Sequence, residues 1–208
     1  MLSDLTVKQF ANDLSSDSPA PGGGAAAALT GVLGASLISM VCNLTSGKEA
    51  YKDFEEEIQD ALEQSQKIKD KLLVLIDEDA KAFSGVMDLY KLPKSTEEEK
   101  AKRTEALQAG FKKAAEVPYE IAEQCLEILK IAEKIVQKSN KNVISDVGVA
   151  VQSALSGLES SVLNVRVNLV FIKDEAYIKT MSDEVDKLIK EGTQLKENTY
   201  KKVLTMLS

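Results

Sequence analysis

The chain has 208 residues, of which 44% are hydrophobic and 28% are charged, and its net charge is −7. This length favours one domain, residues 1–208, with a substantial hydrophobic core. The acidic excess argues against nucleic acid and against an anionic membrane as partners, because both attract basic proteins.

The first predicted elements are a short helix over residues 4–14, with Ser3 as its N-cap, and a junction that reads Pro-Ala-Pro-Gly-Gly-Gly. The junction residues Pro21, Gly22, Gly23 and Gly24 lead directly into a long apolar run. Glycines there expose backbone N–H groups at a helix start, and we expect a positive φ at Gly23. Two interpretations stay open: a docking point for an anionic or carbonyl group of a ligand, or a tight turn that lets buried helices approach.

The apolar run predicts a helix over residues 24–45 that is long enough to span a bilayer. Small residues recur at every fourth position, however, and make one flat face for close packing: Ala27, Gly31, Ala35 and Ser39. A buried central or dimer-interface helix is therefore favoured over a membrane span. The cysteines Cys42 and Cys125 lie in separate apolar segments without a CxxC pair, so we expect neither a disulfide nor a zinc site.

Further helices are predicted over residues 49–90, from Thr96 to about 138, over 144–172 and over 174–207. Leu92-Pro93 should end the second of the long helices, and Ser95 and Thr96 should cap the next one, with Glu98 and Glu99 as their capping-box partners. Pro118 is expected to start a new helix or to kink an existing one. With no strand pattern, the fold class is all-α: a bundle of six to seven mostly long helices with two apolar central helices, 24–45 and 144–172.

The helix predicted over 144–172 carries few charges, and we expect Glu159 and Arg166 on it to form a buried structural pair. A stripe of small and polar residues runs along the same helix from Asp146 to Asn168. The stripe fits a close contact between helices or subunits, and it also fits the polar wall of a ligand cleft with Asp146 at its mouth. Both interpretations stay open.

Several motifs, in this order, together resemble the cyclodeaminase / methenyltetrahydrofolate cyclohydrolase family: Pro19 to Gly24, Leu44-Thr45-x-Gly47-Lys48, Asp79-Ala80-x-Ala82-Phe83, Leu92-Pro93-Lys94, Val117-Pro118, Asn142-x-x-Ser145-Asp146-Val147-Gly148-Val149-Ala150 and Asn164-Val165-x-Val167-Asn168. The resemblance covers nearly the whole chain. One departure is Ser139-Asn140, where the family usually has Gly-Asn. The resemblance implies an all-helical, usually dimeric protein that acts on one-carbon units bound to tetrahydrofolate.

Two reactions follow from the resemblance. A cyclohydrolase adds water to the methenyl carbon and opens the ring to formyl-tetrahydrofolate, whereas a cyclodeaminase closes the ring on a formimino group and releases ammonia. A third possibility is a helical folate-binding or dimerisation module without activity. Both reactions need a proton acceptor and a proton donor but no metal, so we expect a tetrahydrofolate derivative as substrate and no permanently bound cofactor.

The chain has no histidine, so carboxylates and lysines must carry any acid–base chemistry. Asp146 and Asp79 lie in matched motifs and are the first catalytic candidates, with Lys94 as a candidate proton donor. The alternatives are a solvated position for Asp79 on its helix and a helix-start carboxylate for Asp146. Residues assigned to substrate binding are the junction residues from Pro21 to Gly24, together with Lys48, Arg103, Asn142, Ser145 and Asn168.

The roles within this set differ. Lys48, Lys94 and Arg103 could hold the glutamate tail of folate, and Asn142 and Asn168 could bind the pterin or a carbonyl, although Asn142 could equally cap its turn. The N-terminus shows no basic segment followed by an apolar one, so we expect a cytoplasmic protein rather than a secreted one. Its expected partners are a folate molecule and a second copy of the chain.

Overall fold

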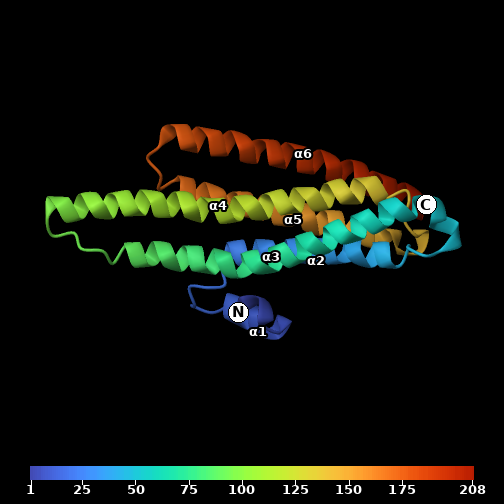
Figure 1. Ribbon diagram of the computed structural model, residues 1–208, viewed down its shortest axis with the longest axis horizontal. Coiled ribbons are helices and arrows are strands. Elements are labelled where there is room, and N and C mark those ends of the chain that lie inside the picture. Colours follow the sequence, from blue (N-terminus) through green and yellow to red (C-terminus); the bar gives the residue numbers. More distant parts are fainter.

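The computed structural model describes residues 1–208 as a long helical bundle without strands (Figure 1). A short helix, α1 (Val7–Leu14), precedes five long ones: α2 (Gly23–Asn43), α3 (Glu55–Leu89), α4 (Glu97–Ile135), α5 (Ile144–Leu169) and α6 (Glu175–Leu207). Three short 3₁₀ turns lie at Leu2–Asp4, Glu49–Phe54 and Lys141–Val143. The all-α prediction and the number of helices are therefore confirmed.

Local capping chemistry sets several helix ends. Thr96 accepts a hydrogen bond from the Glu99 backbone N–H (3.2 Å), and the Glu99 carboxylate accepts one from the Thr96 N–H (3.1 Å), which confirms the predicted capping box for this pair; the N-cap is Thr96 and not Ser95. The first helix begins later than predicted, because Thr6 rather than Ser3 is its N-cap and forms a capping box with Gln9. Gly47 has a φ of +72°, in the left-handed region that ends a helix most easily at glycine.

Pro118 lies in the interior of α4, which continues through it from Glu97 to Ile135, so the expectation of a new helix start there is wrong. A proline inside a helix costs about 3 kcal/mol through its missing N–H group and its ring. In α4 this cost is outweighed by packing, because a row of buried residues runs along the helix on both sides of Pro118. The residues 49–54, predicted as helix, form a 3₁₀ turn before α3.

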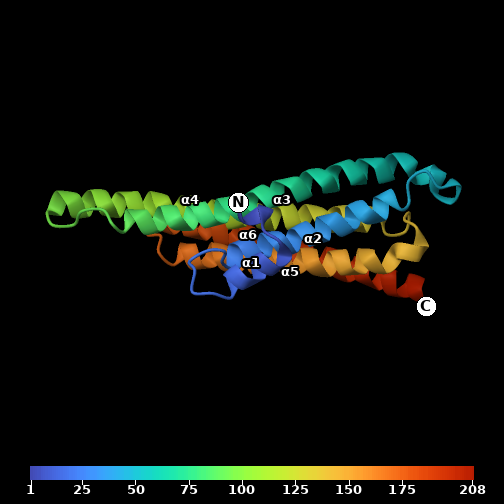
Figure 2. The same cartoon turned by 90° about the horizontal axis from the view of Figure 1, so that it is seen from below.

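α2 and α5 lie side by side in the bundle and run in opposite directions (Figure 2). A Cβ atom on Gly34 of α2 would lie 3.1 Å from the backbone oxygen of Ala150, and one on Gly157 of α5 would lie 3.1 Å from that of Ala27. Small residues thus let the two backbones approach closely. α2 also packs on α3 and α4, and α5 on α4 and α6, which confirms that the two apolar helices are central.

α2 is long and apolar enough to cross a membrane, yet most of it is buried inside the bundle. The expected buried pair on α5 is wrong. Arg166 is exposed and forms an ion pair with Asp186 of α6 (2.6 Å), while Glu159 is exposed on the same helix. Two residues seven positions apart share a face, but here that face borders α6 and solvent rather than the core.

Candidate active site

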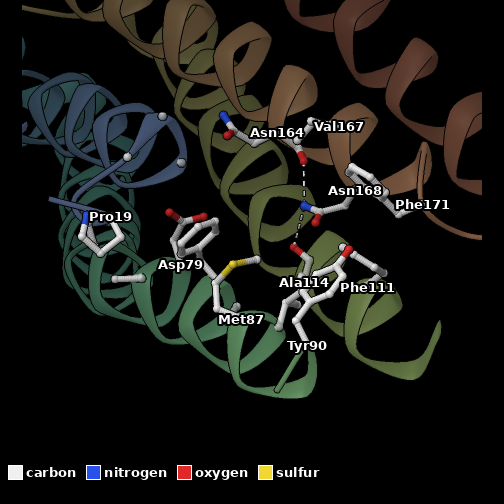
Figure 3. A pocket seen from close by; sticks show the side chains of 18 residues that line it. Pro19, Asp79, Met87, Tyr90, Phe111, Ala114, Asn164, Val167, Asn168 and Phe171 are labelled. Atoms are coloured by element: carbon white, nitrogen blue, oxygen red, sulfur yellow. Dashed lines mark hydrogen bonds between the residues drawn. The ribbon is translucent and has the colours of Figure 1, made fainter. Parts of the chain in front are cut away.

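A cavity of about 410 Å³ lies where the start of α2 meets α3, α4 and the end of α5 (Figure 3). This volume falls within the usual range of small-molecule sites, about 300–1,000 Å³. The polar side of the cavity contains the glycine junction, one carboxyl group and two amides: Gly22, Gly23, Gly24, Asp79, Asn164 and Asn168. The remaining wall is mostly apolar and includes Phe83, Met87, Tyr90, Phe111 and Phe171.

The glycine junction lies between Asp79 of α3 and Asn164 of α5. A Cβ atom on Gly24 would lie within 2.7 Å of every atom of the Asp79 carboxyl group, and one on Gly23 would lie 3.2 Å from Asn164 Oδ1. Gly22 has nothing within 4 Å of such an atom. None of the three has a positive φ, so that expectation for Gly23 is wrong. Glycine is required at positions 23 and 24 because neighbouring side chains occupy the space that a Cβ atom would take.

The Asp79 carboxyl group lies at the start of α2, where the N-cap residue is Gly22, which has no side chain to offer. Burial raises the pKa of Asp79 above its usual range, while its interaction with the backbone N–H group of Ala25 acts in the opposite direction. The interpretation of Asp79 as a solvated surface position is therefore wrong, since the side chain is half-buried and faces the cavity.

Asn164 and Asn168 lie one turn apart on α5 and form the opposite wall (Figure 3). Asn168 was a predicted binding residue, and the structure places it in the cavity. Asn164 was not in the predicted set, although it belongs to the same matched motif. The spacing could have identified it, because residues four apart on a helix share a face.

The aromatic wall is a packed cluster. Phe111 of α4 stacks on Phe171 with ring centroids 4.9 Å apart, and Tyr90 meets Phe111 edge-on at 6.2 Å. The Arg103 guanidinium lies 5.4 Å from the centre of the Tyr90 ring and donates to the Tyr90 carbonyl oxygen (3.0 Å). Arg103 thus supports the wall from behind rather than lining the cavity.

Several predicted site residues lie elsewhere. Lys94 is exposed in the loop between α3 and α4, and Pro21 is buried beside the cavity without lining it. Lys48 precedes the Glu49–Phe54 turn at the other end of the bundle. Asn142, Ser145 and Asp146 lie at the start of α5, and Asp146 precedes Asn164 by 18 residues, or roughly 27 Å of helix.

Within one chain, therefore, Asp79 and Asp146 do not face the same cavity. The structure brings together Gly22, Gly23, Gly24, Asp79 and Asn168 from the predicted set. The cavity does not include Asp146, and it does not include three further residues predicted for the site: Lys48, Asn142 and Ser145.

The turn before α5 also explains the departure at Ser139. The Ser139 hydroxyl donates to the carbonyl oxygen of Ile135 (2.8 Å) at the end of α4. The Asn140 side chain donates to the Leu44 carbonyl (2.9 Å) and accepts from the Asn142 N–H (3.1 Å). Serine is thus accommodated at the helix end, and Asn140 rather than Asn142 supplies the capping side chain.

Comparison with known proteins agrees with these features. Residues 6–187 match the family described as formiminotransferase-cyclodeaminase. The chain is 43% identical over 203 residues to methenyltetrahydrofolate cyclohydrolase of Methylorubrum extorquens, covering 98% of each protein. It is 31% identical over 191 residues to formimidoyltransferase-cyclodeaminase of Rattus norvegicus, covering 92% of this chain and 35% of that protein. The crystal structure of formiminotetrahydrofolate cyclodeaminase from Thermotoga maritima has a TM-score of 0.90 and 29% identity, with both chains fully covered.

Proposed function

The chain belongs to the formiminotransferase-cyclodeaminase family, and on this premise we propose that it hydrolyses methenyl-tetrahydrofolate to formyl-tetrahydrofolate. The match to the bacterial cyclohydrolase extends over the full length of both proteins, whereas the chain spans about a third of the rat enzyme. The observation in the structure that carries the proposal is the Asp79 carboxyl group, half-buried in a cavity with aromatic walls.

The methenyl substrate is a cation, so a carboxylate beside its reactive carbon stabilises it through charge. Asp79 accepts a proton from water as the water oxygen bonds to that carbon. The hydroxyl group of the adduct then loses its proton as the C=O bond forms and one of the two C–N bonds breaks. The departing nitrogen keeps the electron pair and takes up a proton, and the carbon remains on the other nitrogen as a formyl group. One proton is released overall.

The position of Asp79 suits the transfer of a proton from water to its carboxylate. Its pKa is raised by burial, which makes the carboxylate a stronger base than an exposed aspartate and brings its titration nearer to neutral pH. The start of α2 and the Ala25 N–H group favour the ionised form of the Asp79 carboxyl group. The group can therefore act as a base although burial raises its pKa. The glycines at positions 23 and 24 allow the ligand and the carboxyl group to approach the same helix end.

The test is the rate at which purified protein removes methenyl-tetrahydrofolate, followed by its near-ultraviolet absorbance and corrected for spontaneous hydrolysis. We expect acceleration in proportion to enzyme, and a loss of about 100-fold or more in Asp79→Asn, since a positioned base contributes roughly 10²–10⁴-fold. Absence of acceleration by the wild-type protein would contradict the proposal.

The second candidate is the cyclodeaminase reaction, which is favoured by the full-length likeness to the crystal structure of formiminotetrahydrofolate cyclodeaminase from Thermotoga maritima. The same carboxyl group would then accept a proton from the attacking folate nitrogen. Ammonia release from formimino-tetrahydrofolate, measured beside the first assay, separates the two. If neither substrate reacts, a folate-binding or structural relative is left.

We also propose that the protein is a cytoplasmic homodimer that needs no permanently bound cofactor. The outward faces of α2 and α5 expose large apolar side chains, among them Leu33 (54%), Leu163 (68%) and Val167 (54%). If a second copy of the chain packed on these faces, the apolar side chains would be removed from water. Sedimentation at micromolar concentration tests the dimer, and a monomer would contradict it.

A further inference from the structure

The two amides on α5 are held by their nitrogen atoms. Asn168 Nδ2 donates to the carbonyl oxygens of Ala114 (3.2 Å) and Asn164 (2.9 Å), and Asn164 Nδ2 donates to the Ser160 carbonyl (2.9 Å). Figure 3 shows the Asn168 amide reaching from α5 to the α4 backbone at the edge of the cavity. The side chains are therefore fixed in orientation before any ligand arrives.

This anchoring determines what the amides can offer a ligand. An amide nitrogen has two hydrogen atoms, and Asn168 uses both of them on backbone carbonyls. Within the chain, the Oδ1 atoms of Asn164 and Asn168 accept no hydrogen bond, although both residues line the cavity. Asn168 therefore presents an acceptor only, and the Asn164 oxygen adds a second acceptor on the same wall.

We infer that Asn164 and Asn168 recognise the 2-amino and ring N–H groups of the substrate's pyrimidine ring. The inference rests on the proposed function and adds an orientation to it: the donor edge of the pterin faces α5, and the reactive carbon faces Asp79 on α3. Neutral acceptors bind N–H donors without adding charge, so the carboxylate stays available to the cationic carbon. The two amides are positioning and specificity residues, not acids or bases.

An interaction between a side chain and one substrate group is measured by removing each in turn. The ligands are formyl-tetrahydrofolate and its analogue with the 2-amino group replaced by methyl, bound to wild type, Asn164→Ala and Asn168→Ala. For the wild-type protein we expect roughly fivefold to tenfold weaker binding of the analogue, the value of one hydrogen bond. At least one alanine variant should bind both ligands within about twofold, because its partner for the amino group is gone.

A matched control is Gln152→Ala, an exposed position on α5 outside the cavity. It should discriminate between the ligands as wild type does. If both asparagine variants also discriminate as wild type does, or if wild type binds the two ligands equally, the inference is wrong. A structural role alone would weaken both ligands by the same factor and would leave the discrimination unchanged.

Failure of this inference is distinguishable from failure of the proposed function. Hydrolysis of methenyl-tetrahydrofolate by the wild-type protein, together with unchanged discrimination in the variants, overturns only the assignment of the amides. Absence of both hydrolysis and binding overturns the two together. Circular dichroism of each variant establishes that the helices are intact before binding is compared.

Discussion

Alanine at position 24 would place a methyl group where the Asp79 carboxyl group now lies. That methyl carbon would be within 2.7 Å of the Cγ, Oδ1 and Oδ2 atoms of Asp79. Real Cβ contacts stay above 3.0 Å, so the carboxyl group must withdraw by about 1 Å, and a displacement of this size in a reacting group costs on the order of 100-fold in rate. We therefore expect kcat/KM for methenyl-tetrahydrofolate to fall about 100-fold in Gly24→Ala.

The neighbouring glycines supply graded controls. Gly22→Ala has open space and should stay within about twofold of wild type, since its φ of −123° also suits alanine. Gly23→Ala meets Asn164 at 3.2 Å and should give an intermediate loss. All three changes add the same methyl group, so the order of their effects follows the space at each position and not the loss of glycine itself.

A double-mutant cycle separates displacement of Asp79 from general damage. If Gly24→Ala acts by moving the carboxyl group, it should cost almost nothing further in the Asp79→Asn background, because the group is already disabled. Additive losses, or a Gly24→Ala variant as active as Gly22→Ala, would refute the reasoning. Thermal unfolding accompanies the kinetics, since overpacking of this kind costs about 1–3 kcal/mol.

Four further outcomes are expected. Burial raises the pKa of Asp79 in the fold, so its ionisation lowers stability as pH rises through the carboxyl range; Asp79→Asn should therefore unfold at higher urea than wild type near pH 7 but not near about pH 3. A Cβ on Gly157 would meet Cys125 Sγ at 2.9 Å and two backbone atoms, so Gly157→Ala should lose about 1–3 kcal/mol in urea unfolding, and an unchanged midpoint would contradict this packing. Phe171→Ala should raise KM several-fold with kcat little changed, because Phe171 is half exposed and lines the aromatic wall; an equal fall in kcat would assign it to the chemistry instead. Asp146 lies outside the cavity of its own chain, so it can act there only from a second copy; in that case an inactive Asp146→Asn mixed with Asp79→Asn should regain about a quarter of wild-type activity through mixed dimers, whereas full activity of Asp146→Asn alone would remove it from the mechanism.

Much of the helix pattern was predictable because it depends on neighbours in the sequence. The capping box of Thr96 with Glu99 is set within a few residues of the sequence, and it is confirmed. The effect of Pro118 on its helix was not predictable in the same way. Whether a proline ends a helix depends on how much packing the helix gains beyond it, and that gain comes from other helices.

The candidate site was predicted in part. Asp79 and the glycine junction were identified, but their contact is a tertiary one, between helices about 55 residues apart in sequence. The separation of Asp146 from Asn168 could have been read from the sequence, because 22 residues of one continuous helix extend roughly 33 Å. The role of Asn140 in the turn, and the support of Tyr90 by Arg103, could be found only once the chain was folded.

The central claim is that Asp79 takes the proton from water in this cavity. Its most direct test is the pH dependence of kcat/KM for methenyl-tetrahydrofolate in wild type and Asp79→Asn, corrected for spontaneous hydrolysis. Wild type should show an inflection above the ordinary aspartate pKa of about 4, and the variant should lose both that inflection and about 100-fold or more in rate. A variant that keeps the wild-type rate and the same inflection would contradict the account.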